Sequence, residues 1–128
     1  MNPKRILVID DDTGLTQMVK LNLEATGHYE VCIENDSTLA VGTARRFRPD
    51  LILLDYVMPE MDGGDVTFSL NEDPFLRDVP IVMVTALLAN KEMSPDGTVH
   101  RGGQVMLAKP VKMDNLLKCI EKHLLPAE

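Results

Sequence analysis

Short runs of apolar residues recur along the 128-residue chain, and many of their members are β-branched. Every position within these runs is apolar, which is typical of strands that are buried on both faces of a parallel sheet. We therefore predict strands at residues 6–9, 31–33, 51–54, 81–84 and 105–107.

Between these runs, apolar residues recur mainly at intervals of three and four, the spacing of a helix with one buried face. This spacing is found over residues 15–23, 40–47 and 116–124, and a turn at residues 62–64 precedes another short helix. The interval 87–103 contains one proline and three glycines and has no sustained apolar face. A fourth helix in this interval is therefore expected to be short, broken or mobile.

The alternation of strands and helices predicts an α/β fold with a doubly wound parallel sheet, because parallel strands need crossover connections. A chain of 128 residues and 14.2 kDa has the size of one domain, so we expect residues 1–128 to form one unit. Its 20 acidic and 13 basic residues give a net charge of −7, which argues against direct binding of nucleic acid. The chain shows neither a signal peptide nor a membrane span, so we expect a cytoplasmic protein with no membrane partner.

Polar residues stand at the ends of four of the five predicted strands. In sheets of this kind, ligands bind outside the carboxyl ends of the strands, so these residues are candidates for a common site. They are Asp10-Asp11-Asp12, Asp55, Thr85-Ala86 and Lys109-Pro110.

Carboxylates brought into one small pocket repel each other, and this repulsion raises their pKa values unless a cation is present. Mg²⁺ prefers oxygen ligands and is usually held by one or two carboxylates together with water or phosphate oxygens. A divalent cation is therefore expected at these strand ends. Asp12 matches no ligand position and is expected to flank the start of the following helix, where a negative charge is favourable.

Four segments together resemble the receiver domains of two-component response regulators, the CheY-like family. These segments are Ile6–Asp12, Leu53–Gly63, Val84–Ala86 and Lys109-Pro110, and they stand in the family's order over nearly the whole chain. The resemblance implies a flavodoxin-like (βα)5 fold with strand order 2-1-3-4-5 and a core of about residues 4–124. It places strands one and three side by side.

The resemblance also implies a metal site. Asp11 and Asp55 would bind Mg²⁺ directly, Asp10 would bind it directly or through water, and the backbone carbonyl of Val57 would add one more ligand. Mn²⁺ is an alternative to Mg²⁺ at such oxygen ligands.

By the same resemblance, Asp55 is the phosphoacceptor nucleophile, which forms an acyl phosphate. Lys109 would supply a positive charge to the transferred group, Thr85 would donate a hydrogen bond to it, and Ala86 would leave room for it. The peptide between Lys109 and Pro110 would be cis, which aims the lysine inward.

The implied phosphoryl donor is a phosphohistidine on a sensor histidine kinase or a histidine phosphotransfer protein. The expected activity is self-phosphorylation and autodephosphorylation, without turnover of external substrates. The output would be a change in partner binding through the face formed by the fourth helix, the fifth strand and the last helix. The downstream protein is not identified by the sequence, and a phosphorylation-linked homodimer is among the expected assemblies.

The sequence departs from the family at Met106, three residues before Lys109. Receiver domains usually have an aromatic residue there, which swings inward together with the threonine that matches Thr85. Methionine changes rotamer easily but has neither a ring nor a hydroxyl, so we expect the switch between Thr85 and Met106 to be altered. We also expect residues 93–97 to lack uniform order.

Three other functions fit the sequence less well. A haloacid dehalogenase-type phosphatase has an aspartate nucleophile and Mg²⁺, and Asp10-x-Asp12 matches its motif, but Gly14 stands where Thr or Val is required. A receiver-like adaptor that works without phosphorylation would generally lack Asp55 or Lys109, and both are present. A flavin or nucleotide carrier is disfavoured because three aspartates occupy the place of a phosphate loop.

Overall fold

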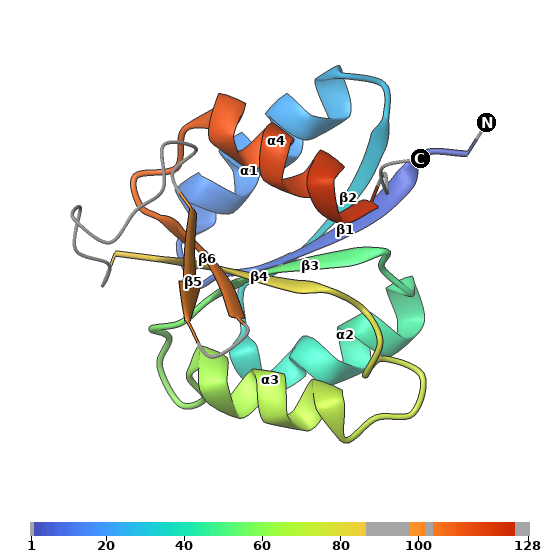
Figure 1. Cartoon of the computed structure of the whole chain (residues 1–128). Coiled ribbons are helices and arrows are strands. Elements are labelled where there is room, and N and C mark those ends of the chain that lie inside the picture. Colours follow the sequence, from blue (N-terminus) through green and yellow to red (C-terminus); the bar gives the residue numbers. More distant parts are fainter. Residues whose placement is uncertain (1, 87–97, 102–103, 125–128) are drawn as a thin grey trace.

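The computed structural model describes residues 2–86, 98–101 and 104–124 (Figure 1). Its elements are β1 (Lys4–Ile9), α1 (Thr13–Ala25), β2 (Tyr29–Glu34), the 3₁₀ turn η1 (Ser37–Leu39), α2 (Ala40–Phe47), β3 (Leu51–Asp55), α3 (Gly63–Asn71), β4 (Ile81–Thr85), β5 (Thr98–Arg101), β6 (Gln104–Ala108) and α4 (Met113–Leu124).

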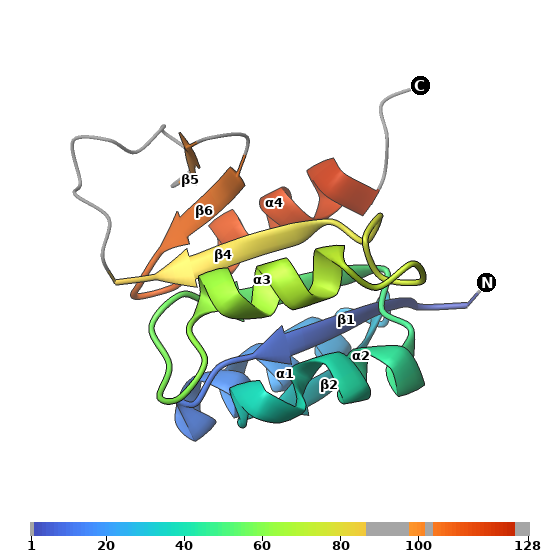
Figure 2. The same cartoon turned by 90° about the horizontal axis from the view of Figure 1, so that it is seen from below.

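The strands form one sheet of order β2-β1-β3-β4-β6-β5. All neighbours from β2 to β6 are parallel, which confirms the predicted doubly wound sheet of order 2-1-3-4-5 when β6 is counted as the fifth parallel strand. β5 was not predicted. It pairs antiparallel with β6 at one edge of the sheet, as Figure 2 shows, and lies in the interval that the sequence assigned to an irregular fourth helix. Residues 93–97, for which irregular order was expected, lie outside the described residues.

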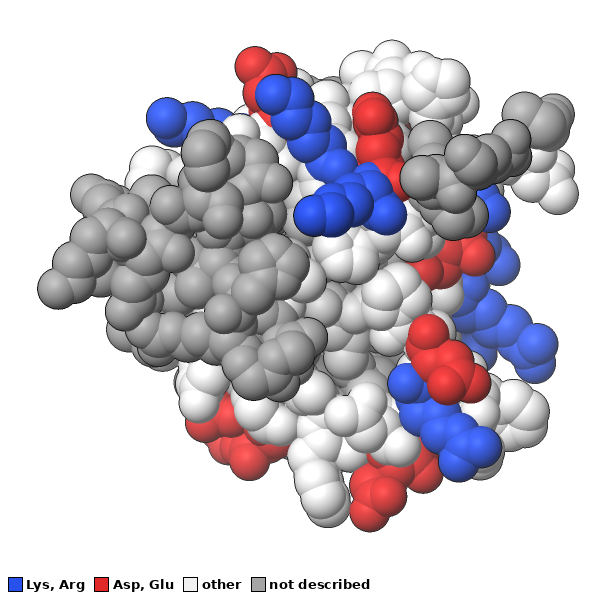
Figure 3. All heavy atoms as spheres, viewed as in Figure 1, with Lys and Arg blue, Asp and Glu red and all other residues white. Residues whose placement is uncertain are grey.

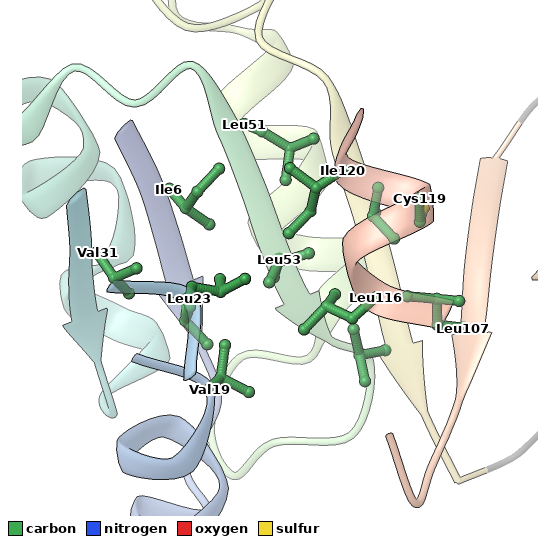
Figure 4. Close-up of a cluster of buried hydrophobic side chains, with 13 residues drawn as sticks. Ile6, Val19, Leu23, Val31, Leu51, Leu53, Leu107, Leu116, Cys119 and Ile120 are labelled. Carbon is green, nitrogen blue, oxygen red and sulfur yellow. The ribbon is translucent and has the colours of Figure 1, made fainter. Parts of the chain in front are cut away.

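Helices cover both faces of the sheet, with α1 and α4 on one face and α2 and α3 on the other (Figure 1). Ile6 and Val8 belong to the core under α1 and α4, whereas Leu7 and Ile9 belong to the core under α2 and α3. Figure 4 shows the first of these cores, in which side chains of the central strands meet those of both helices. Because side chains alternate between two buried faces, the four buried positions of β1, Ile6–Ile9, are all apolar.

Two aspartates begin helices close to the carboxyl edge of the sheet. Asp12 caps α1, and its Oδ1 accepts a hydrogen bond from the backbone N–H of Leu15 at 3.0 Å. Asp62 caps α3 in a reciprocal arrangement with Asp65. Such caps satisfy backbone donors that have no partner within the helix, so they fix where each helix starts relative to the strand before it.

Candidate functional site

Asp55 is the last residue of β3, the strand that lies between β1 and β4 in the sheet. Only 5% of its surface is exposed. The backbone N–H of Val57 donates to its Oδ1 at 3.4 Å. The central strand therefore delivers a nearly buried carboxylate to the carboxyl edge of the sheet.

Gly63, the first residue of α3, allows that helix to approach the end of β3 closely. Its N–H donates to the carbonyl of Tyr56 at 2.6 Å. A Cβ added to Gly63 would lie 2.7 Å from the carbonyl oxygen of Asp55 and 2.7 Å from the Cα of Tyr56. These are backbone atoms that cannot move aside cheaply, so the position next to the site requires glycine.

Asp10 and Asp11 follow β1, the neighbour of β3. Asp10 is buried, and its Oδ1 accepts a hydrogen bond from the N–H of Asp12 at 2.9 Å. Asp11 is exposed. Each of Asp10, Asp11 and Asp55 offers a carboxylate oxygen, and these oxygens all lie within 4.8 Å of one another. The predicted acidic cluster is therefore assembled by the pairing of β1 with β3.

Lys109 follows β6 and reaches this cluster from the other side of β4. Its Nζ lies 2.8 Å from Oδ2 of Asp10 and 3.3 Å from Oδ2 of Asp55. Its backbone N–H donates to the carbonyl of Thr85 at 3.0 Å, which ties it to β4. The peptide between Lys109 and Pro110 is cis, as predicted.

Burial and the neighbouring charge of Asp10 raise the pKa of Asp55 above its ordinary value, although Lys109 and the N–H of Val57 oppose this. Burial alone would lower the pKa of Lys109, but its hydrogen bonds and charge interactions with Asp10 and Asp55 outweigh burial and raise it. Lys109 is thus held in the charged form, yet one ammonium group offsets only one of three neighbouring carboxylates. The cluster retains an excess of negative charge.

The donor set fits a hard divalent cation. Three carboxylates within binding distance of one another provide the oxygen ligands that Mg²⁺ prefers, and the exposure of Asp11 leaves the cluster open to solvent on one side. The residues that would hold the ion are Asp10, Asp11 and Asp55. The carbonyl of Val57 as a further ligand stays a prediction.

Three predicted residues remain: Thr85 ends β4, Ala86 follows it, and Met106 lies on β6. Thr85 is buried at the end of β4, and Ala86 follows it in an exposed turn. Thr85 is paired with Ala108, and Met83 with Met106. Because side chains on a strand alternate, this register puts Thr85 and Met106 on the same face, and partly buried Met106 packs against the core under α2 and α3. Thr85 and Met106 therefore lie on the same face of two neighbouring strands, as a switch between them would require.

A surface pocket of about 250 Å³ opens beside the acidic cluster, at the carboxyl edge of the sheet. It reaches the exposed Asp11, so another molecule could approach the cluster from this side. Its lining residues are Asp11, Asn35, Asp36, Ser37, Met58, Pro59 and Glu60.

Asn35 is a contact of this site that the sequence did not reveal. It directly follows β2, and its Nδ2 donates to the backbone carbonyl of Asp10 at 2.7 Å. A polar residue directly after a strand was the available signal, since the same signal identified Asp10 and Asp55.

The molecular surface carries both signs of charge. On the face seen in Figure 3, Lys and Arg side chains lie beside Asp and Glu side chains. Among the described residues, no helix combines the length and apolar character needed to cross a bilayer.

Comparisons with known proteins agree with this geometry. The family model of the response regulator receiver domain matches residues 6–121. The polar-differentiation response regulator DivK of Brucella anthropi is 30% identical over 123 residues, which cover 95% of this chain and 97% of DivK. The response regulator PleD of Caulobacter vibrioides is 43% identical over 107 residues, which cover 84% of this chain but 23% of PleD. The chain therefore spans almost all of the first relative and a minor part of the second.

The fold comparison gives the same result. The solved structure of chemotaxis protein CheY4 from Vibrio cholerae matches with a TM-score of 0.81 and 26% identity, covering 96% of this chain and 100% of that one. The match includes the parallel sheet whose edge carries the acidic cluster. The chain belongs to the response regulator receiver domains of two-component systems.

Proposed function

We propose that this receiver domain accepts a phosphoryl group on Asp55, with a divalent cation held by Asp10, Asp11 and Asp55. The observation that carries the proposal is the contact of one ammonium group, that of Lys109, with two buried carboxylates of a three-carboxylate cluster. A purely structural ion pair needs one partner of each sign. Here the excess of carboxylates leaves a binding place for a second cation and, with it, for a phosphoryl group.

In the proposed reaction, a carboxylate oxygen of Asp55 attacks the phosphorus of a phosphohistidine. The new P–O bond forms while the P–N bond breaks, and the imidazole nitrogen leaves with the electron pair of that bond. Bound Mg²⁺ would supply positive charge that lowers repulsion between the carboxylate and the phosphoryl oxygens. Lys109 would pair with the added oxygens, and the buried Thr85, at the end of the adjacent strand, would donate a hydrogen bond to them.

The proposed phosphoryl donor is a sensor histidine kinase or a histidine phosphotransfer protein, and the chain would not turn over an external substrate. The proposed output is a change at β6 and α4, transmitted through Thr85 and Met106 on their common sheet face. In this output route, the flexible thioether of Met106 would take the place of the aromatic ring that the family usually has.

Incubation with acetyl phosphate and Mg²⁺, followed by intact-mass measurement, tests the proposal. We expect a phosphoryl adduct that is labile at alkaline pH and that requires both the metal and Asp55. Asp55→Asn should remove the adduct, whereas Asp114→Asn, which changes an exposed aspartate in the first turn of α4, should keep it.

Two outcomes would contradict the proposal. A folded wild-type protein that forms no adduct with acetyl phosphate or with a phosphorylated phosphotransfer protein would favour the phosphorylation-independent adaptor. An adduct that survives Asp55→Asn but is lost in Asp10→Asn would favour the phosphatase-like arrangement with Asp10 as nucleophile.

A further inference from the structure

Asn35 joins the end of β2 to the turn that carries Asp10 and Asp11. Its Nδ2 donates to the backbone carbonyl of Asp10 at 2.7 Å and to the hydroxyl oxygen of Thr16 at 3.1 Å. Thr16, on α1, is fully buried, and its hydroxyl in turn donates to the carbonyl of Thr13 at 3.1 Å. Both hydrogens of the Asn35 amide are therefore used within one network.

The chemistry of the acceptors fixes the orientation of this amide. The carbonyl of Asp10 can only accept, so the NH₂ group of Asn35 must face it. The hydroxyl of Thr16 has its proton directed at Thr13, which leaves a lone pair for Asn35. Only one orientation of the Asn35 amide satisfies both hydrogen bonds. In this orientation the side chain connects the end of β2 to the residue after β1 and to α1.

Asn35 and Lys109 contact different groups of Asp10. The Asp10 carboxylate is already fixed by the N–H of Asp12 and by Lys109. Asn35 instead fixes the Asp10 carbonyl, which belongs to the planar peptide leading into Asp11. Among the described residues, the Asp11 carboxylate makes no hydrogen bond or ion pair. The peptide that Asn35 holds sets the position of the Asp11 backbone from which this carboxylate projects.

We propose that Asn35, supported by Thr16, is a positioning residue that aims the Asp11 carboxylate at the divalent cation. This rests on the proposed function, because it requires the cation site. Residues that orient metal ligands from outside the coordination sphere commonly change metal affinity by about 10- to 100-fold when mutated. We expect Asn35→Ala to weaken Mg²⁺ binding about 10-fold.

Mg²⁺ titration of the unphosphorylated protein, followed by backbone amide chemical shifts at constant pH, tests this directly. Thr16→Val, which removes the hydroxyl, should weaken Mg²⁺ binding by a smaller factor of about 3, and Thr16→Ser should restore the wild-type affinity. Asn22→Ala is the matched control. Asn22 makes a similar amide bond, from its Nδ2 to the carbonyl of Met18 at 2.7 Å, but on the exposed surface of α1.

The outcomes separate this inference from the proposed function. Wild-type protein that binds Mg²⁺ while Asn35→Ala binds it equally well, with only a lower melting temperature, would show that Asn35 is merely structural. Wild-type protein without saturable Mg²⁺ binding would overturn the proposed function and this inference together. If Asn35→Ala does not fold, the comparison of Thr16→Val with Thr16→Ser decides, and equal affinities for these two variants would overturn the inference.

Discussion

Asp55 and Asp73 are both buried and both contact a basic side chain, but they lie at opposite ends of the strands. Asp55 ends β3 and shares Lys109 with Asp10. Asp73 lies in the connection from α3 to β4, where its Oδ2 pairs with Nε of Arg45 and its Oδ1 accepts the N–H of Phe75 at 2.9 Å. At Asp55, one lysine side chain serves a cluster of three carboxylates. At Asp73, a single carboxylate has an arginine and a backbone N–H as its donors.

This difference sets the pKa values of the two groups in opposite directions. The hydrogen bond from Arg45, followed by that from Phe75, lowers the pKa of Asp73. Burial, followed by the charge of Asp10, raises the pKa of Asp55. A buried carboxylate whose donors are all supplied by the chain fastens a loop. A buried carboxylate that shares one lysine with another carboxylate can still bind a metal cation, and the proposed phosphoryl transfer needs this property.

Removal of the Lys109 ammonium group, which Asp10 and Asp55 share, should have the largest effect on stability. Lys109→Met leaves Asp10 and Asp55 together without a positive partner, and we expect the free energy of unfolding in metal-free buffer to fall by about 3 kcal/mol. Urea unfolding at pH 7 with EDTA measures this. Arg45→Met should cost less because the Arg45 side chain is 61% exposed. An equal or larger loss for Arg45→Met would mean that the two pairs are energetically alike.

The backbone around Asp55 should be the next most sensitive feature. Gly63→Ala forces a Cβ against the backbone of Asp55 and Tyr56, and we expect a loss of about 2 kcal/mol. Gly42→Ala is the matched change on α2, the helix that carries Arg45. Its Cβ would meet no atom closer than 3.6 Å, so helix propensity should raise stability by about 0.5 to 1 kcal/mol. Thermal or urea unfolding of both variants checks the difference, and a tolerated Gly63→Ala would refute the close approach.

Mg²⁺ should stabilise the folded protein by binding at the cluster of Asp10, Asp11 and Asp55, and not at Asp73. At a concentration ten times its dissociation constant, a ligand of the native state adds about 1.4 kcal/mol, and EDTA should reverse the gain. Asp55→Asn should reduce this response to Mg²⁺, whereas Asp73→Asn should leave it unchanged. Thermal melting with and without Mg²⁺ measures both responses, and loss of the response in Asp73→Asn would break the distinction between the two sites.

The smallest expected effect is an opposite dependence of stability on pH, measured without metal. Since the pKa of Asp73 is lowered by folding, its contribution is present above its ordinary pKa and is lost as pH falls through the folded value. Asp73→Asn should therefore lower the melting temperature at pH 7, by less in acid.

For Asp55, folding raises the pKa, so its penalty develops as pH rises through the ordinary value and is complete above the folded value. Asp55→Asn should then raise stability at pH 7, by on the order of 1 kcal/mol, with little gain in acid. Melting curves across the acidic range compare the two variants. Changes of the same sign in both would contradict the opposite pKa shifts.

Much of the site could be predicted because its residues stand directly after apolar strands. In a parallel sheet, the carboxyl ends of the strands share one edge, so Asp10, Asp55, Thr85 and Lys109 had to converge there. Asn35 stands after a strand in the same way, but its function depends on a backbone carbonyl, and no sequence pattern identifies which carbonyl a side chain will meet.

The strand β5 shows a second limit. Its four residues, Thr98–Arg101, are followed by Gly102-Gly103, a pair that often connects the strands of a hairpin. In the sequence, these glycines and Pro95 equally fit a broken helix. Such a short strand has little pattern of its own, and it is defined by its pairing with β6.

The sequence by itself determined the alternation of strands and helices, the parallel sheet and the identity of the acidic and basic residues at its carboxyl edge, because these follow from periodicity and from the position of each residue along the chain. Only the tertiary structure decided that one lysine serves two aspartates, that Gly63 must lack a side chain and that Asn35 holds the carbonyl of Asp10. These are distances between segments far apart in the chain, and they are set by how β1, β2, β3 and β6 pack together.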